Sequence, residues 1–234
     1  MHLLLDLDGT LINSSPGIYH SFSLACLSLG LQVPSFASFC QMIGPPVQDI
    51  ASRLYPDLDA IALENFRKIF RNDYDSHSYR NAVWYPGVLD TLFTLALNQS
   101  LRISIVTNKP TSPSRELIKS AGMLPFFVDI VGIDYRVLHS TGAMFASKAE
   151  ALSFFLDYTS THYSQSLYVG DTLGDRDACA LTRVAFIAAL YGFHQWAVRD
   201  RPPLCLERFD DIHRVFPIIY PTCELTDRGA SSCD

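Results

Sequence analysis

Residues 3–11 read LLLDLDGTL, an apolar run that meets two carboxylates, Asp6 and Asp8, and then a glycine. Such an apolar run is typical of a buried strand in a parallel sheet. Ligands of open α/β sheets bind beyond the carboxyl ends of the strands, where both aspartates are expected to lie. Two adjacent carboxylates repel each other unless a cation or a shared proton relieves them. The stretch therefore indicates a metal site or an acid/base pair, and the alternative is an ordinary Asp-Gly turn after a strand.

The composition is that of a globular protein. The 234 residues are enough for one large α/β domain or for a core with a smaller insert. Apolar residues make up 48% of the chain and the net charge is −6, which argues against disorder and against non-specific binding to nucleic acid. No apolar run reaches membrane-spanning length, and no basic segment precedes Asp6. We therefore expect no membrane partner and a cytoplasmic location.

Several common site patterns are missing from the sequence. The six cysteines form no C-x-x-C pair, and most stand in apolar stretches, so we expect reduced structural thiols. The seven histidines show no H-x-H or H-E-x-x-H spacing, which argues against a zinc site. Neither a G-x-G-x-x-G fingerprint nor a Walker loop is present, which argues against a dinucleotide-binding or P-loop enzyme.

Residues 14–82 show helical patterns and no clear strand. Helices are expected from about 18 to 29, from about 47 to 54 and from about 58 to 69, with a break, MIGPP, at 42–46. Compact domains rarely carry long idle loops, so we predict that 14–82 forms an inserted helical cap. Residues 1–13 and 83–220 are then the core, and 221–234 is predicted to be a loose tail.

From Val88 onward, helical and strand patterns alternate. Helices are predicted at 88–98, 112–121, 147–158, 175–182 and 210–216, and strands at 102–107, 126–133, 167–171, 184–190 and 204–206. The stretch between Ile133 and Ser147 has no readable pattern. The alternation implies a parallel sheet with right-handed crossovers, so the predicted fold class is α/β.

Three later stretches place polar side chains where predicted elements end or begin. A strand ends in the hydroxyl of Thr107, Lys148 stands ahead of an apolar helix pattern, and the string LYVGDTLGD contains Asp171 and Asp175. Each has an ordinary alternative. Thr107 could cap the helix that follows it, Lys148 could be solvated, and Asp175 could be a helix N-cap.

The order D-x-D-G-T, then T, then K, then G-D-T-x-x-D resembles the haloacid dehalogenase superfamily of phosphohydrolases. The resemblance runs from residue 3 to about residue 216. The helical cap and its break at 42–46 most resemble the phosphoglycolate phosphatase-like branch. The resemblance implies a Rossmann-like core with an inserted cap, and an Mg²⁺-dependent phosphatase acting on a small phosphomonoester through an aspartyl-phosphate. Many relatives follow the motif lysine with proline, whereas Ala149 follows it here, so only the lysine position is carried over.

The resemblance also implies roles for the four acids. Asp6 is similar to the nucleophile and a Mg²⁺ ligand, and Asp8 to the general acid/base, with its backbone carbonyl on the metal. Asp171 looks like a further metal ligand, and Asp175 like an orienting carboxylate or a ligand through water. These roles suit the chemistry, because a phosphate monoester is a dianion that needs charge neutralisation, an in-line nucleophile and a proton for the leaving oxygen.

Substrate contacts are implied in the same way. Thr107 would bond the phosphoryl group together with the backbone amide of Asn108, and Lys148 would neutralise the phosphate and hold the nucleophile. Gly44 and Pro45 would lie on a substrate-facing loop of the cap, for which an ordinary interhelix turn is the alternative. The expected partner is a small phosphorylated metabolite, and the chain is expected to be a monomer or a homodimer. Candidates for binding a second anionic group of the substrate are the cap arginines Arg53, Arg67, Arg71 and Arg80.

Other functions remain open. A sugar-phosphate mutase could use the same core. A phospho-accepting receiver module also combines acids, a hydroxyl and a lysine, but receivers are about half this length and their acceptor lies well inside the chain, unlike Asp6. Asp8 favours phosphate chemistry, because the dehalogenases of the superfamily lack this second acid. A phosphonate-cleaving enzyme would need a cap lysine, and the cap offers only Lys68, which is expected on the surface.

Overall fold

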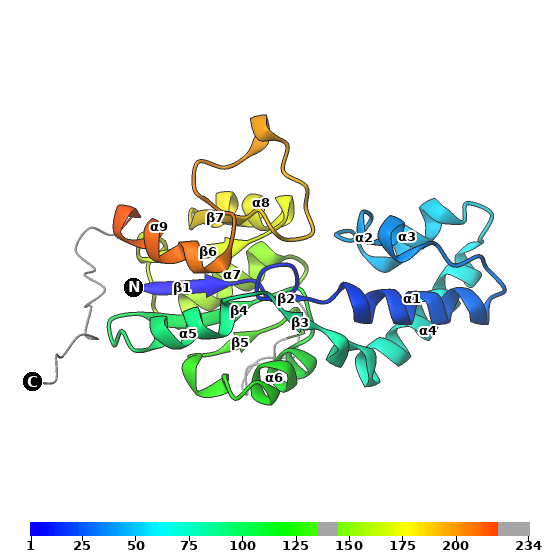
Figure 1. Cartoon of the computed structure of the whole chain (residues 1–234), viewed down its shortest axis with the longest axis horizontal. Helices are drawn as coiled ribbons and strands as arrows, with labels where there is room; N and C mark the ends of the chain where they lie inside the picture. The colour runs from blue at the N-terminus through cyan, green and yellow to red at the C-terminus, as the bar shows by residue number, and fades with distance from the viewer. Residues whose placement is uncertain (135–144, 220–234) are drawn as a thin grey trace, which may run out of the picture.

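The computed structural model, which describes residues 1–134 and 145–219, shows a parallel sheet with helices on both faces (Figure 1). Within these residues the main sheet has six strands in the order β5-β4-β1-β6-β7-β8, and every pairing in it is parallel. The strands are β1 (His2–Leu5), β4 (Arg102–Val106), β5 (Ile130–Val131), β6 (Ser166–Gly170), β7 (Ala185–Ala189) and β8 (Cys205–Leu206). The predicted α/β class is confirmed.

Strand β1 lies at the centre of the sheet, between β4 and β6. Its last residue, Leu5, is in register with Ile105 on one side and with Val169 on the other. The chain segments that follow these three strands therefore leave the sheet at the same edge. This register brings together the polar residues that follow each strand.

The alternation of side chains along β1 divides the core into two apolar layers. Leu3 and Leu5 are fully buried in the larger layer, and Leu4 is fully buried in the smaller one. The larger layer includes residues of α5 (Val88–Ala96), α6 (Thr111–Ser120) and α9 (Ile212–Ile219). The smaller layer includes residues of α7 (Lys148–Tyr158) and α8 (Leu173–Thr182). Burial on both sides explains why β1 is a continuous apolar run.

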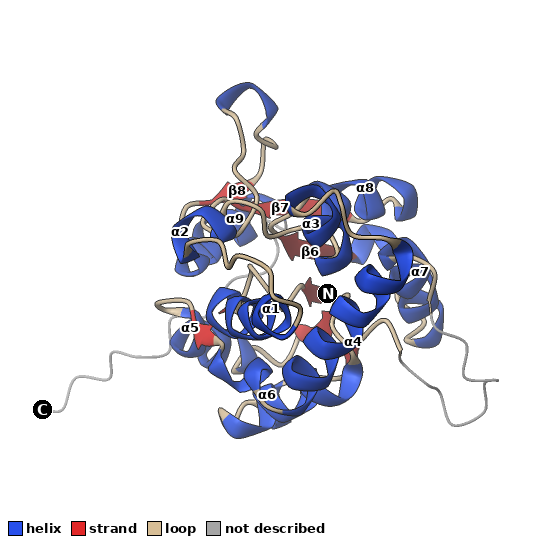
Figure 2. Cartoon of the chain, turned by 90° about the vertical axis from the view of Figure 1, so that its right-hand side faces the viewer, coloured by secondary structure: helices blue, strands red, loops and turns tan. Residues whose placement is uncertain are grey.

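The chain between β2 (Ile12–Asn13) and β3 (Val83–Trp84) forms a separate helical layer beyond the carboxyl edge of the sheet (Figures 1 and 2). β2 and β3 pair in antiparallel fashion, so the two passages between core and helical layer run side by side. The layer consists of α1 (Ser15–Ser28), α2 (Phe36–Cys40), α3 (Val47–Leu54), α4 (Ala60–Ser76) and the 3-10 turn η1 (Ser78–Asn81). The arrangement is consistent with an inserted cap, and the boundaries 14–82 stay a prediction.

The helices of this layer pack through aromatic side chains that belong to the same buried cluster as the larger layer of the core. The rings of Phe22 in α1 and Phe66 in α4 meet edge to face with their centres 4.9 Å apart. The centre of the Phe39 ring in α2 lies 4.6 Å from that of Phe22. All three rings are fully buried. The N-cap of α4 is Asp59, whose carboxylate accepts a hydrogen bond from the Ala62 N–H at 2.8 Å. Removing one of these rings, as in Phe66→Ala, should cost about 3–5 kcal/mol of stability.

The sequence analysis missed two features of this layer and one of the core. It did not predict α2, and α4 continues to Ser76, well past the predicted end at 69. The strand predicted at 126–133 is wrong in length, because only Ile130–Val131 is strand and Leu124–Phe126 forms a 3-10 turn. Pro125 in that turn has no N–H to donate to a ladder. The other predicted elements of the core occur with bounds shifted by a few residues.

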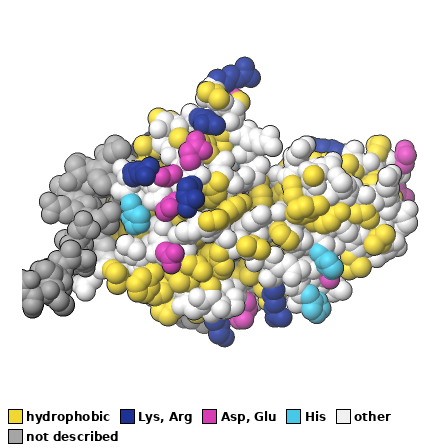
Figure 3. Space-filling model, in the orientation of Figure 1, with side chains coloured by type: hydrophobic (Ala, Val, Ile, Leu, Met, Phe, Trp, Pro, Cys, Tyr) yellow, Lys and Arg dark blue, Asp and Glu magenta, His cyan; other side chains and the backbone are white. Residues whose placement is uncertain are grey.

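Some predictions fall outside the described residues. These are the tail at 221–234, with Cys223 and Cys233, and most of the stretch between 133 and 147. The remaining cysteines have free thiols: Cys26, Cys40, Cys179 and Cys205. Among the described helices, none is long and apolar enough to cross a membrane. On the face shown in Figure 3, acidic and basic side chains are intermixed over the core.

Candidate active site

The chain leaves β1 in a tight turn that places both aspartates at the carboxyl edge. The Asp6 N–H still pairs with the Val169 carbonyl at 2.9 Å, and Asp8 lies within the turn, in which the Thr10 N–H donates to the Leu7 carbonyl at 3.3 Å. Gly9 adopts a φ of +83°, and a Cβ there would lie 2.2 Å from a carboxylate oxygen of Asp171. This position therefore requires glycine, both for its backbone conformation and for the close approach of Asp171.

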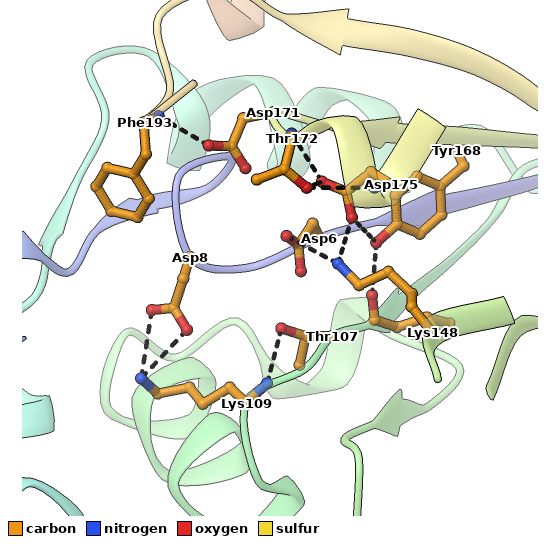
Figure 4. A network of polar contacts seen from close by, with 11 residues as sticks. Asp6, Asp8, Thr107, Lys109, Lys148, Tyr168, Asp171, Thr172, Asp175 and Phe193 are labelled. Atoms are coloured by element: carbon orange, nitrogen blue, oxygen red, sulfur yellow. Dashed lines mark hydrogen bonds and ion pairs between the residues drawn. The ribbon is translucent and has the colours of Figure 1, made fainter. Parts of the chain in front are cut away.

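Three buried carboxylates, those of Asp6, Asp171 and Asp175, meet at this edge (Figure 4). Each contributes one oxygen, and these oxygens lie within 4.8 Å of one another. The Oδ1 atoms of Asp6 and Asp171 are buried without a hydrogen-bond partner in the described part of the chain. Buried carboxylate oxygens without partners are unfavourable, and oxygen ligands of this kind are those that Mg²⁺ prefers. The donor set therefore fits a divalent cation.

Lys148 supplies a positive charge to this cluster. It is the first residue of α7, whose N-cap is Ser147. Its Nζ lies 3.1 Å from Oδ2 of Asp6 and also donates to Oδ1 of Asp175. Burial opposes the charge of Lys148, but the two carboxylates outweigh it and raise the pKa of this lysine above its usual value. Lys148 is only 8% exposed, so the alternative of a solvated helix residue is wrong.

One lysine does not offset the burial and mutual repulsion of the carboxylates. Burial, with contributions from neighbouring carboxylates, raises the pKa of Asp6 to about 6 although Lys148 acts in the opposite direction. Burial and the charges of Asp6 and Asp175 likewise raise the pKa of Asp171 well above its usual range. A bound cation would reverse this balance and favour the ionised acids.

Asp175 is held by the first turn of α8. Its Oδ2 accepts hydrogen bonds from the Thr172 N–H at 2.9 Å and from the Thr172 hydroxyl at 2.7 Å, while that hydroxyl accepts from the Asp175 N–H at 3.2 Å. Thr172 is thus the N-cap of a capping box, and the alternative of Asp175 as the N-cap is wrong. The arrangement aims the other oxygen of Asp175 at Lys148.

The loop after β7 holds Asp171. The Phe193 N–H donates to Oδ2 of Asp171 at 2.7 Å, and Nε1 of Trp196 donates to its backbone carbonyl at 3.1 Å. A Cβ at Gly192 would lie 2.2 Å from Cβ of Asp171, so this loop too comes very close. The sequence analysis missed this loop, although Gly192 directly followed by an aromatic residue after a predicted strand is a detectable signal.

Thr107 and Asn108 follow β4 toward the same point. Thr107 is 2% exposed, and its hydroxyl accepts the Lys109 backbone N–H at 3.3 Å. Helix α6 has Pro110 as its N-cap, so the alternative of Thr107 as a helix cap is wrong. Thr107 and Asn108 line a cavity of about 340 Å³ that Asp6 also borders.

The sequence analysis also missed Lys109. Its Nζ lies 3.3 Å from both carboxylate oxygens of Asp8 (Figure 4) and donates to the Tyr74 hydroxyl at 2.6 Å. Burial opposes the charge of Lys109, but Asp8 and Tyr74 raise its pKa above the usual value. The available signal was its place directly after Thr107-Asn108 at the end of a strand.

Cap residues close the cavity on its other side. Gly44 and Pro45 line the 340 Å³ cavity, as do Arg67 and Arg71 of α4. Gly44 and Pro45 also line an adjoining cavity of about 620 Å³, which Arg53 borders.

Two other cap cations lie elsewhere. Arg80 lines neither cavity, and its guanidinium lies 5.3 Å from the centre of the Tyr79 ring. Lys68 is 66% exposed beside Glu64, which agrees with its predicted surface position.

Buried acids, a hydroxyl and a lysine around a cavity at the carboxyl edge of a parallel sheet define an α/β enzyme with a site for an anionic substrate. The family model of the haloacid dehalogenase-like hydrolases matches residues 3–189. The chain therefore belongs to the haloacid dehalogenase-like hydrolase family. The predicted family and the predicted class of enzyme, a phosphatase of this family, are confirmed, and the receiver module is excluded.

Curated relatives and solved structures agree with this assignment. The chain is 28% identical over 222 residues to a phosphoglycolate phosphatase of Pseudomonas fluorescens, covering 92% of this chain and 78% of that protein. It is 26% identical over 220 residues to a phosphoglycolate phosphatase of Photobacterium profundum, covering 90% and 93%. The fold is similar to that of a haloacid dehalogenase-like hydrolase of Streptococcus pneumoniae, with a TM-score of 0.80 at 24% identity over 92% of this chain and 97% of that one. The fold is also similar to that of a predicted phosphoglycolate phosphatase of Haemophilus somnus, with a TM-score of 0.77 at 23% identity over 92% of this chain and 96% of that one.

Proposed function

We propose that this chain is an Mg²⁺-dependent phosphatase that hydrolyses a small phosphomonoester of the phosphoglycolate kind. The observation that carries the proposal is the cluster of Asp6, Asp171 and Asp175, whose oxygens lie within 4.8 Å of one another. Lys148 lies 3.1 Å from Asp6, and Asp6 borders the cavity of about 340 Å³. Relatives named phosphoglycolate phosphatase support the choice of substrate class.

Each residue of the core has a place in the proposed reaction. Asp6 attacks the phosphorus atom, forming an aspartyl-phosphate as the bond to the leaving oxygen breaks. Asp8 donates a proton to that leaving oxygen and then accepts one from the water that hydrolyses the aspartyl-phosphate. Thr107, the Asn108 amide and Lys148 hold the phosphoryl oxygens in place.

The acids would also hold the cation. Asp6, Asp171 and the backbone carbonyl of Asp8 are the proposed ligands, and Asp175 orients them or acts through water. Bound there, Mg²⁺ would neutralise charge on the phosphoryl group as Asp6 approaches it. The carboxylates must be ionised to bind the cation. The charge of the neighbouring Lys148 favours their ionised forms, because it acts to lower the pKa of Asp6 and of Asp171.

The helical layer would select the leaving group. In the proposed reaction the core residues act on the phosphoryl group, its leaving oxygen and the metal, which are common to all monoesters, so they would not distinguish one monoester from another. Gly44 and Pro45 line the cavity together with Arg67 and Arg71, and a guanidinium suits a carboxylate or a second phosphate. A cavity of about 340 Å³ has room for a small leaving group but not for a protein surface.

A screen of phosphate release tests this function. Phosphate esters of two to six carbons, an aryl phosphate and phosphopeptides would be compared with and without Mg²⁺. We expect release from the small esters only with Mg²⁺, a higher kcat/KM for them than for phosphopeptides, and a preference for anionic leaving groups. No release from any ester would contradict the proposal. Phosphoryl transfer between sugar positions would identify a mutase instead. The oligomeric state and the cytoplasmic location stay predictions.

A further inference from the structure

A buried lysine joins Asp8 to the helical layer. The side chain of Lys109 is 2% exposed, and its Nζ contacts both oxygens of Asp8 at 3.3 Å and the Tyr74 hydroxyl at 2.6 Å. The same Nζ lies 4.6 Å from the centre of the Tyr74 ring. Tyr74 belongs to α4, so a single ammonium group links a residue of the core turn to a residue of the helical layer.

Both ends of this link are firmly held. The Lys109 N–H donates to the Thr107 hydroxyl, and a Cβ at Gly132 would lie 2.4 Å from the Lys109 carbonyl, so the core encloses this backbone tightly. The Tyr74 ring stacks on Phe70 of the same helix at 5.4 Å with an interplanar angle of 12°. Tyr74 is 5% exposed. The packing of the core and of α4 therefore determines where the ammonium group lies.

The carboxylate of Asp8 has less support than its backbone, which bridges Ile12. Its side chain is 25% exposed, and within the described residues Lys109 is the partner that its carboxylate contacts. Proton transfer to a leaving group requires a donor held at hydrogen-bond distance in the right direction, and small displacements reduce the rate strongly. The orientation of Asp8 thus depends on Lys109 and, through it, on Tyr74.

We propose that Lys109 and Tyr74 are positioning residues that orient Asp8 for proton transfer when α4 lies against the core. This inference rests on the proposed function, in which Asp8 protonates the leaving oxygen. Neither residue needs to touch the reacting atoms. Packing of α4 against the core would then also align Asp8, so that protonation of the leaving oxygen is favoured when the helical layer covers the cavity.

Leaving-group dependence separates this role from a merely structural ion pair. An alkyl phosphate needs a proton on its leaving oxygen, whereas an aryl phosphate leaves with little help. Loss of alignment should therefore lower kcat for 2-phosphoglycolate much more than for 4-nitrophenyl phosphate. A general loss of packing would lower both rates alike. Asp8→Asn serves as the reference for the pattern expected when the acid itself is lost.

The experiment compares Lys109→Met, Tyr74→Phe and the double variant on both substrates. We expect Lys109→Met to lower kcat for 2-phosphoglycolate by about 10- to 100-fold, part of the full worth of a general acid, and to change kcat for 4-nitrophenyl phosphate by about threefold or less. Tyr74→Phe should show the same selectivity at about 3- to 10-fold, because the ammonium group keeps Asp8 but loses one anchor. The Tyr74→Phe effect should disappear in the Lys109→Met background, because both act on one acid.

Matched controls come from exposed residues of the same types. Lys119→Met and Tyr158→Phe should leave both rates unchanged, since Lys119 is exposed and Tyr158 is 55% exposed. Thermal unfolding checks that each variant folds. If Lys109→Met does not fold, Tyr74→Phe, which removes one oxygen atom, tests the positioning role by its ratio of kcat for 2-phosphoglycolate to kcat for 4-nitrophenyl phosphate.

Equal losses on the two substrates, or additive effects in the double variant, overturn the inference. Those outcomes leave the proposed function intact, because the wild-type chain would still release phosphate from both esters. A wild-type chain inactive on both esters with Mg²⁺ overturns the proposed function and the inference with it.

Discussion

The Nζ atom of Lys148 lies 3.1 Å from Asp6 and also donates to Asp175, so one buried ammonium group is shared by two carboxylates. Asp171, the third acid of the cluster, receives a backbone N–H from Phe193 at 2.7 Å instead. The cluster therefore keeps a surplus of acidic oxygens. Such a surplus of buried oxygens favours the binding of a cation.

Asp6→Asn should abolish phosphate release while leaving the fold intact. An amide is a poor nucleophile and a weaker metal ligand, but it is nearly isosteric and removes a charge that burial disfavours. Phosphate release and thermal unfolding would be measured side by side. The control is Asp157→Asn, the same change at an exposed position of α7, which should keep full activity. A folded Asp6→Asn protein with more than about a tenth of wild-type activity would remove Asp6 from the nucleophile role.

Mg²⁺ should stabilise the folded chain and restore activity after chelation. A ligand that binds only the native state raises its stability by about 2.7 kcal/mol at one hundred times its dissociation constant. We expect the melting temperature of the chelated protein to rise with added Mg²⁺, and Ca²⁺ to restore activity poorly, because it tolerates looser geometry.

The variant Asp171→Asn tests where the cation binds. Its melting temperature should respond much less to Mg²⁺, since it lacks one of the two carboxylate ligands, Asp6 and Asp171, of the proposed site. An equal rise in both proteins would place the cation elsewhere, and full activity after exhaustive chelation would contradict the metal assignment.

One of the cavity arginines should carry the preference for an anionic leaving group. Losing the partner of a buried carboxylate costs on the order of 2–4 kcal/mol, so Arg→Ala at the true contact should lower kcat/KM for 2-phosphoglycolate by about 30- to 1000-fold. Arg67 and Arg71 border the smaller cavity and Arg53 the larger one, so these three are tested singly. Arg80→Ala is the matched control, because Arg80 lies against Tyr79 outside both cavities. Near-neutral effects of all three would refute the carboxylate preference but not the phosphatase assignment.

His2 should make the stability of the fold depend on pH. Burial, together with the charge of Arg102, lowers the pKa of His2 from its ordinary value of 6.5 to about 4. The unfolded chain then binds the proton first, so the contribution of His2 is fully present above about pH 6.5 and is lost as the pH falls toward 4. At pH 5 the loss should be about 2 kcal/mol relative to pH 7.5.

Urea unfolding at the two pH values measures this loss. His2→Gln is the comparison, because a glutamine does not titrate and keeps polar atoms near Ser104, whose hydroxyl lies 2.8 Å from Nε2 of His2. The fall in unfolding free energy between the two pH values should be smaller in the variant. The same fall in both proteins would show that His2 is not the group responsible.

The positions of the core acids were predictable because they depend on local pattern. An apolar run followed by a carboxylate places that carboxylate just beyond a strand, and parallel strands end at one edge of the sheet. This rule places Asp6, Thr107 and Asp171 each at the end of a strand, and the family resemblance predicted that they belong to one site. Strand length was less predictable, as β5 shows. The apolar pattern from residue 126 to 133 does not reveal that Phe126 belongs to a 3-10 turn with Pro125, or where the chain reaches the edge of the sheet.

The contacts that complete the site depend on elements far apart in the sequence. Lys109 meets Tyr74 because α4 folds back over the carboxyl edge, and Trp196 meets Asp171 because the loop after β7 returns to the site. Neither contact can be predicted from the spacing of residues along the sequence. The sequence by itself therefore determined the parallel sheet, its acidic edge and the family. Only the tertiary structure decided which arginines border the cavity and which lysine supports Asp8, because side-chain direction follows from packing between distant elements.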